Sequence, residues 1–139
     1  MQSHVNLSRI VRAAGCFGLT RVVACGNARV DTQIARNALE QVSLEVHRSL
    51  LPTLKQLRSE GYRLVGLEQA TGSVPLSDYR FTRATVLVVG HERHGLTEEM
   101  LEVMDDVVEI PMYGRPDSHN AATAAAIAMY EYCRQFPSG

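Results

Sequence analysis

The stretch "VVGHERHGLTEEM", residues 88–100, places two histidines, a glutamate and an arginine between two glycines. Residue types of this kind could form a metal site, a catalytic cluster or a solvated turn. His91 and His94 are three residues apart, which would suit a metal ion if both lay on a helix. Gly90 and Gly95 favour a turn instead, and no third ligand follows at a recognisable spacing. We therefore do not expect a metal.

Two other classes of chemistry are also poor fits to these motifs. The GHERHG loop has neither the GxGxxG pattern of dinucleotide-binding folds nor the GKS/T ending of a P-loop. Ser118 could be paired with a histidine as a hydrolase nucleophile, but no GxSxG motif surrounds it. His119 is its immediate neighbour, which is poor geometry for a general base.

Size and composition indicate a single domain, residues 1–139, with an ordinary apolar fraction. We expect a cytoplasmic protein, because the three cysteines are scattered without a CxxC pair and no leader or membrane span is recognisable.

The net charge of −1 argues against bulk electrostatic capture of nucleic acid. However, every basic residue except Lys55 is an arginine. Arginine binds phosphate in a bidentate manner, although a GC-rich genome would explain the same bias, and both interpretations stay open.

The elements that must position these residues alternate between strand and helix. Short apolar strands are predicted at 21–25, 42–47, 62–69, 84–90 and 106–112. Helices are predicted at 6–18, 31–39, 49–61, 96–104 and 120–136, with Asp31, Ser49, Thr97 and Asn120 as N-caps. Continuous apolar strands joined by helices predict an α/β fold with an open, mostly parallel sheet and helices on both faces.

The conspicuous polar residues follow the carboxyl ends of these strands, where α/β proteins bind ligands. "LEQATG", "GHERHG" and "IPMYGRPDSHN" each follow a predicted strand, and "NLSRIVR" opens the first helix with Asn6 and Arg12. We expect the four segments to form one composite pocket.

The last helix is small or apolar nearly all round from Ala121 to Tyr130. A helix on a sheet buries only one side, so the second side needs another partner. A second copy of the chain is the simplest choice, and the sequence therefore predicts a homodimer through this helix. Alanine used only for its helix propensity is the alternative.

Three blocks, in order and spacing, carry a resemblance to a known family. They are "NLSRIVRAAGCFG", "LVVGHERHGL" and "VEIPMYGRPDSHNAATAAAIAMYEY", which together run from Asn6 to Tyr132. The chain resembles the SpoU (TrmH-type) branch of the SPOUT family of RNA 2′-O-ribose methyltransferases. The resemblance implies a deep C-terminal trefoil knot, S-adenosylmethionine as cofactor, a dimer, and methyl transfer to a ribose 2′-hydroxyl. It also implies an adenine pocket lined by Leu67, Gly90, Ile110, Ser118 and His119.

The catalytic set implied by the resemblance is Asn6, Arg12, Glu92, Ser118 and Asn120. Family accounts make the arginine a general base, which conflicts with the permanent protonation of arginine in proteins. Our hypothesis is that Arg12 clamps the adjacent phosphate and stabilises the developing oxyanion. Asn6 would orient Arg12, and Glu92 would pin its loop or an arginine. Ser118 and Asn120 would shape the cofactor end and position the hydroxyl.

The chain departs from the family pattern at three places. Ser8 stands where glycine is usual, His119 replaces leucine in the Ser-Leu-Asn block, and only five residues precede Asn6. Family members have a strand ahead of that asparagine, so we expect this domain to lack the usual first strand and the sheet neighbour to be exposed. A catalytically inactive RNA-binding or dimerisation module is therefore the alternative function.

An RNA substrate would be recognised by the dimer itself, because no appended RNA-binding domain is recognisable. A compact tRNA element fits such a surface better than a large rRNA domain. The candidate phosphate contacts are Arg9, Arg29, Arg36, Arg93 and Arg115.

Overall fold

The computed structural model describes residues 4–25, 30–70, 72–90, 95–111, 113–114 and 120–137. Its elements, in chain order, are α1 (His4–Cys16), β1 (Arg21–Cys25), α2 (Thr32–Ala35), the 3-10 helix η1 (Arg36–Glu40), β2 (Ser43–His47), α3 (Leu51–Ser59), β3 (Arg63–Leu67), β4 (Val74–Pro75), η2 (Leu76–Asp78), β5 (Thr85–Val89), α4 (Glu98–Val103), β6 (Asp106–Glu109) and α5 (Ala121–Gln135). Within the described ranges, no helix has the length and apolar character needed to cross a membrane.

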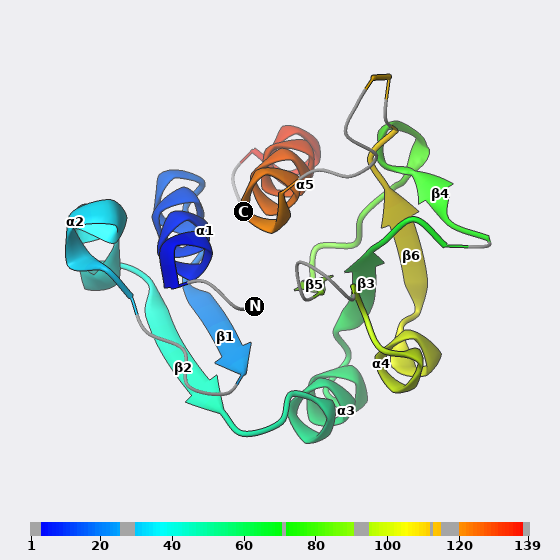
Figure 1. The fold of residues 1–139 in the computed structure, drawn as a ribbon. Coiled ribbons are helices and arrows are strands. Elements are labelled where there is room, and N and C mark those ends of the chain that lie inside the picture. The colour runs from blue at the N-terminus through cyan, green and yellow to red at the C-terminus, as the bar shows by residue number, and fades with distance from the viewer. Residues whose placement is uncertain are drawn as a thin grey trace.

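All recorded strand pairs are parallel, as the apolar strands predicted. The strands form two separate sheets, one with the order β1-β2 and one with the order β4-β6-β3-β5 (Figure 1). The sequence predicted one open sheet and did not predict β4. The division arises because β1 and β5, which face each other across the molecule, are not paired (Figure 1).

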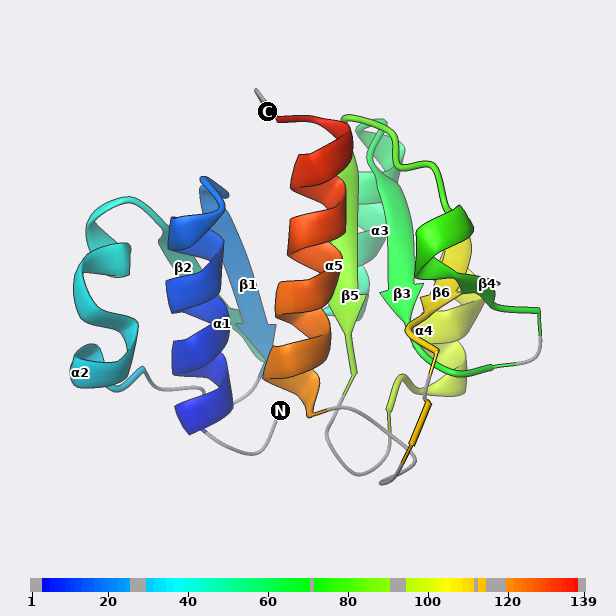
Figure 2. The same ribbon diagram turned by 90° about the horizontal axis from the view of Figure 1, so that it is seen from above.

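Helices cover both faces of the sheets, as predicted. α1 and α5 lie on one face, while α3 lies on the other (Figure 2). Strand β3 shows why: Leu64 packs with α3 residues such as Leu54, whereas the next residue, Val65, packs with Ala128 of α5. Successive side chains of a strand point to opposite faces, so a strand apolar at every position must be covered on both sides.

Three of the four predicted helix caps are confirmed. The side chains of Asp31, Thr97 and Asn120 each accept a backbone N–H at the start of α2, α4 and α5. The prediction for Ser49 is wrong, because α3 begins one residue later and Leu50 occupies the cap position without a side-chain bond. Pro52 lies in the first turn of α3, where its missing N–H leaves one donor fewer to be capped.

The helix predicted at 31–39 is only partly α-helical. It ends at Ala35 and continues as the 3-10 helix η1. The change occurs at Arg36, a non-glycine residue with a positive φ of 56°. Such a backbone angle is incompatible with a continuous right-handed helix, which accounts for the break.

The apolar helix α5 packs against two partners within the single chain. Ala122, Ala125 and Met129 share a core cluster with residues of α1, and Ala128 packs on the β3 side. The second apolar side that predicted a homodimer is thus partly covered by α1. Tyr130 remains exposed on α5 at 61%.

Candidate functional site

The carboxyl ends of β3, β5 and β6 lie at one edge of the larger sheet, as the composite pocket required (Figure 2). Leu67 closes β3, Gly90 follows β5, and Ile110 follows β6. α1 and α5 both begin at this same edge (Figure 2). The three described residues of the predicted adenine pocket are thereby brought together on neighbouring strands.

The loop after β5 is pinched closed at its base. A Cβ atom on Gly90 would overlap the carbonyl carbon of Gly95 and lie 2.5 Å from the backbone nitrogen of Leu96. Only glycine permits two backbone segments to approach so closely. The segment 91–94, which contains His91, Glu92, Arg93 and His94, lies outside the described residues, so the roles predicted for Glu92 and Arg93 stay predictions.

Glu68, the residue directly after β3, holds the far end of this loop. Its carboxylate Oε2 accepts the backbone N–H of Leu96 at 2.7 Å. Its own backbone N–H donates to the carbonyl of Val108 on β6 at 3.0 Å. Gly95 has a φ of +65°, and a Cβ atom there would overlap the Glu68 carboxylate. Glu68 thus ties the ends of β3, β5 and β6 to one another.

Glu68 lies within the motif "LEQATG", for which the sequence alone predicted no individual role of this residue. Two features of the sequence could have indicated this role: an acidic residue directly after a strand, Glu68, and a glycine at the end of the loop after another strand, Gly95. The hydrogen bond from Leu96 to Glu68 spans 28 residues, and only the folded chain shows it.

Asn120 is confirmed as a helix cap at the same edge. Its Oδ1 accepts the backbone N–H of Ala122 at 2.9 Å and that of Thr123 at 3.4 Å. The carboxamide therefore has a structural role, and its exposure leaves a second role open. Ser118, His119 and Arg115 lie outside the described residues, as does the course of 115–119 on which the predicted knot depends.

Asn6 and Arg12 lie on different faces of α1. Asn6 is 4% exposed, whereas Arg12 is exposed. Six residues along a helix turn the side-chain direction by about 240° and advance it by about 9 Å. Both belong to the helix that begins at the site edge, but the prediction that Asn6 orients Arg12 stays a prediction.

Ser8, the residue that departs from the family glycine, is fully buried. Its hydroxyl oxygen accepts the backbone N–H of Asp31 at 2.7 Å. A buried hydroxyl needs such a partner, so the substitution is accommodated by a bond to the start of α2.

Two of the five predicted RNA contacts, Arg9 and Arg36, fall on described surface. Arg9 and Arg36 are exposed, as is Arg12, and α1 packs against both α2 and η1. Among the described residues, the recorded arginine ion pairs involve Arg21, Arg58, Arg63 and Arg134. The exposed arginines of α1 and η1 take part in none of these pairs. Arg29, Arg93 and Arg115 lie outside the described residues.

A cluster of charge-assisted hydrogen bonds lies at the opposite edge of the sheet, where β3 and β6 begin. Asp106 accepts hydrogen bonds from Arg63 Nε at 2.7 Å and from the Tyr79 hydroxyl at 2.5 Å. The bond from Arg63 lowers the pKa of Asp106, while burial and the Asp106 bond raise the pKa of Tyr79 to about 12. This cluster joins β3 to β6 and lies away from the candidate site.

The described part of the chain contains no cluster of three or more His, Cys, Asp or Glu side chains able to hold a metal ion. His91 and His94 fall outside that part.

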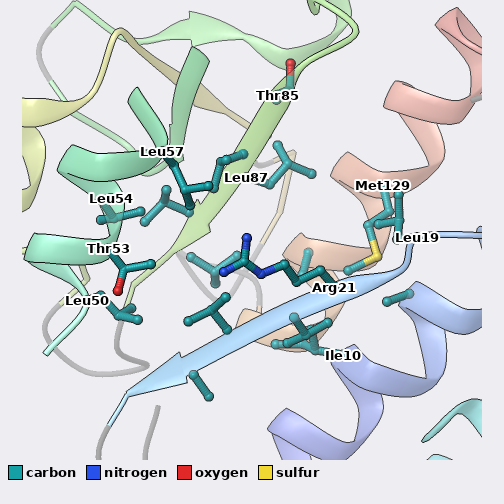
Figure 3. Close-up of a pocket in the computed structure, with 18 of the residues that line it drawn as sticks. Ile10, Leu19, Arg21, Leu50, Thr53, Leu54, Leu57, Thr85, Leu87 and Met129 are labelled. Carbon is teal, nitrogen blue, oxygen red and sulfur yellow. The ribbon is translucent and has the colours of Figure 1, made fainter. Parts of the chain in front are cut away.

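One cavity of the described chain does not coincide with the candidate site. It has a volume of about 540 Å³ and lies between β1 and β5, and we call it the β1–β5 groove (Figure 3). Leu67, Gly90 and Ile110 are absent from its lining. The sequence motifs and the strand ends, rather than this cavity, therefore define the candidate site.

Comparison with known proteins agrees with this geometry. Residues 1–130 match the model of the SpoU rRNA Methylase family. Over 133 residues the chain is 29% identical to the tRNA (guanosine(18)-2′-O)-methyltransferase of Escherichia coli K12, covering 94% of this chain and 58% of that enzyme. The chain therefore spans little more than half the length of that relative.

Two solved structures are similar to this fold. The A. aeolicus TrmH/SpoU tRNA modifying enzyme has a TM-score of 0.92 and 28% identity, covering 99% of this chain and 72% of that one. The SpoU methyltransferase AviRb from Streptomyces viridochromogenes, solved in complex with the cofactor AdoMet, has a TM-score of 0.83 and 31% identity, covering 99% and 58%. With the family match extending over 130 of the 139 residues, this chain belongs to the SpoU rRNA methylase family.

Proposed function

We propose that this protein is an S-adenosylmethionine-dependent RNA methyltransferase that methylates a ribose 2′-hydroxyl. The observation that carries the proposal is the glycine-pinched loop at the carboxyl ends of β3, β5 and β6, in a chain of this family. A related structure of the same family holds AdoMet. Strand ends with close-approaching backbone are where α/β folds bind cofactors.

The residues of this edge fit the cofactor. Leu67 and Ile110 offer apolar surface, and Gly90 offers backbone without a side chain, as a flat adenine ring requires. Ser118 and His119 complete the proposed pocket through their main chain. When bound, S-adenosylmethionine supplies an activated methyl group, and the work left to the protein is positioning and electrostatics.

Arg12 is the proposed catalytic residue. It is exposed on the helix that begins at the site edge, where a phosphate of the substrate could reach it. Its guanidinium would clamp the phosphate next to the target ribose and stabilise negative charge on the 2′-oxygen as the proton leaves. Asn6, Glu92, Ser118 and Asn120 would hold the surrounding groups in place.

We infer that the substrate is tRNA, since two similar proteins are named as tRNA-modifying enzymes. Arg9 and Arg36 support this with exposed positive charge on one side of the molecule, and Arg29, Arg93 and Arg115 would extend it.

We further propose a homodimer through α5 and action in the cytoplasm, where tRNA is found. The three cysteines are free, which is consistent with a reducing compartment.

Calorimetric titration with S-adenosylmethionine and S-adenosylhomocysteine tests the cofactor proposal without knowledge of the RNA. We expect binding with a Kd of roughly micromolar order, typical of about −8 kcal/mol. Lys55→Ala, on the exposed face of α3, is the control variant and should bind equally. Absence of binding by the folded chain would contradict the proposal.

Methyl transfer from labelled S-adenosylmethionine to tRNA and to rRNA then tests the reaction. We expect label in tRNA, resistant to alkaline hydrolysis at the 3′-linkage because the 2′-oxygen is blocked. Cofactor binding without transfer to either RNA would favour the inactive RNA-binding module instead.

A further inference from the structure

Arg36 lies at the junction of α2 and η1 with backbone angles that arginine rarely adopts. Its φ of 56° and ψ of −133° are close to those of the first central residue of a type II′ turn, a position that glycine dominates. Every other described residue with a positive φ is a glycine. A side chain is costly in this region of backbone space, so the conformation of Arg36 is strained.

Packing on either side of Arg36 holds the strained conformation in place. Ala35 is fully buried and Ala38 is 8% exposed, and both belong to the core cluster that contains residues of α1. Ala38 lies so close to α1 that a Cβ atom on Gly15 would stand only 2.9 Å from the Ala38 Cβ. The backbone N–H of Arg36 donates to the carbonyl of Thr32. The turn at residue 36 therefore accompanies the docking of α2 and η1 on α1.

The side chain of Arg36 does not contribute to this packing. It is exposed, and none of the ion pairs recorded among the described residues includes it. Glycine could adopt the same backbone angles without strain, so the fold gains nothing from arginine here. Strained residues held by their surroundings cluster at binding and catalytic sites. We therefore looked for a ligand of the guanidinium group.

The helix beside this segment supplies further positive charge. α1 lies between α2 and α5, and its exposed residues include Arg9 and Arg12 (Figure 2). Arg12 is one turn beyond Ser8, whose hydroxyl accepts the backbone N–H of Asp31 at the start of α2. Residues four apart lie on the same side of a helix, so Arg12 borders the side of α1 that α2 covers.

Two carboxylates belong to the same surface and do not neutralise it. The Asp31 side chain is committed to capping α2, where it accepts the Gln33 N–H at 2.9 Å. Glu40 is exposed at the end of η1, and none of the ion pairs recorded among the described residues includes it. The three arginines of α1 and η1 thus outnumber the two acids, which favours an anionic ligand with more than one charge.

We propose that Arg36 binds a backbone phosphate of the RNA substrate and that the docked α2–η1 segment holds it in position for this contact. The inference rests on the proposed function, in which Arg12 of the neighbouring helix clamps the phosphate next to the target ribose. An RNA strand presents a row of phosphates, so Arg12 and Arg36 bind different phosphates of one strand. The guanidinium fork suits a phosphate, and a fixed backbone reduces the conformational entropy lost on binding.

Thermal unfolding of two glycine variants tests the strain. Arg36→Gly should raise the unfolding midpoint by roughly 3 °C or more, because it relieves the strained angles. Asn37→Gly is the matched control, since Asn37 is the next residue, is exposed and has no positive φ. It should lower the midpoint, as glycine does at an ordinary position. A lower midpoint for both variants would overturn the proposal.

Equilibrium binding of unmodified tRNA over a range of salt concentrations tests the phosphate contact. Arg36→Gly should weaken binding by roughly fivefold or more at about 0.1 M salt and lower the slope of log K against log[salt] by about one. Arg36→Lys should retain most of the affinity and the slope, because it keeps the charge. Arg80→Ala removes an exposed arginine that follows η2 and should change neither quantity.

The binding results separate this inference from the proposed function. Equal affinity and slope for wild type and Arg36→Gly would overturn the role of Arg36 alone. A wild-type chain that binds no tRNA would overturn the proposed substrate and this contact together. A stabilised Arg36→Gly chain with weaker tRNA binding is the expected result, and loss of folding cannot imitate it because the variant unfolds at a higher temperature.

Discussion

At the scale of single residues, Arg12 and Glu68 have different roles. Arg12 is proposed to act in the reaction, whereas Glu68 holds a loop in position. Arg12 is exposed and belongs to the helix that starts at the site edge, whereas the Glu68 carboxylate is committed to the Leu96 N–H. An exposed arginine without a recorded ion pair among the described residues is free to meet a phosphate. A carboxylate that accepts a backbone N–H, as that of Glu68 does, instead fixes the conformation of the loop after β5. Their variants should therefore fail in different ways.

Arg12→Lys should lower kcat/KM for methyl transfer by roughly a hundredfold or more, because an ammonium group cannot reproduce the bidentate fork. Cofactor affinity should stay unchanged, since no cofactor contact is assigned to this side chain. Steady-state kinetics with tRNA, together with calorimetry, measures both quantities. Arg80→Lys, exposed and remote in sequence from the site, is the control. A near-normal rate for Arg12→Lys at neutral pH would show that fork geometry is not what matters.

Glu68→Ala should weaken S-adenosylmethionine binding by about tenfold, since losing a charge-assisted bond to a backbone N–H costs on the order of 1.5 kcal/mol. Glu68→Gln should retain part of the affinity, because its carboxamide oxygen can still accept the Leu96 N–H. Calorimetry compares both with Glu102→Ala on the exposed face of α4. Equal affinity in all variants would mean that the loop does not depend on Glu68.

Gly90 is a poor position for testing cofactor contact alone. A side chain there would strike the backbone of Gly95 and Leu96 before it met any ligand. Loss of binding in a Gly90 variant would therefore report the closing of the loop as well as the pocket.

At the scale of elements, the cluster at the beginning of β3 and β6 ties two neighbouring strands together. Asp106 on β6 bonds to Arg63 on β3 and to Tyr79, which follows η2. The folded state therefore favours the charged carboxylate, and the pKa of Asp106 is lowered. Stability gained in this way is present above the pKa of an unfolded aspartate, about 3.9, and is lost as the pH falls through the lower folded value.

Asp106→Asn should accordingly lower the free energy of unfolding by roughly 1–3 kcal/mol at pH 7, through the loss of charge-assisted hydrogen bonds. The difference between variant and wild type should begin to shrink below about pH 4, where the carboxylate of the unfolded chain becomes protonated, and should go on shrinking as the pH falls through the lower folded pKa of Asp106. Urea unfolding at pH 7 and pH 3 measures it, with Asp78→Asn on η2 as the control. A difference that stays constant over this range would contradict the assigned role of the charge.

At the scale of the whole molecule, α5 is the element whose surroundings decide the oligomeric state. α1 covers part of its second apolar side, which weakens the argument from apolarity alone. Tyr130 nevertheless stays 61% exposed, although it touches Phe17 edge-on with ring centroids 6.5 Å apart. An exposed aromatic side chain on an alanine-rich helix is a suitable centre for contact with a second copy.

Tyr130→Asp should convert the proposed dimer into a monomer, because burying an unpaired carboxylate at an interface is costly. Analytical ultracentrifugation over a range of concentrations measures the change. Leu39→Asp, a similar substitution on the exposed part of η1, should leave the dimer intact. A wild-type chain that sediments as a monomer at all concentrations would contradict the proposed dimer.

The local order of the fold could be predicted from the sequence. Apolar strands predicted parallel pairing, and Asp31, Thr97 and Asn120 marked the starts of their helices, because caps and strand patterns depend on residues a few positions apart. The strand-end motifs also placed Leu67, Gly90 and Ile110 at one edge. The two residues of β4 carried too short a pattern to predict, and Ser49 failed as a cap because α3 begins after it.

Which distant segments meet could not be predicted from local patterns and is seen only in the folded chain. The bond from Leu96 to Glu68 spans 28 residues, and that from Arg63 to Asp106 spans 43. The separation of β1 from β5 could not be predicted either. The residue pattern of a strand shows that it is buried, but not which strand lies beside it. Pairing of this kind depends on the whole chain's packing, and no local pattern encodes it.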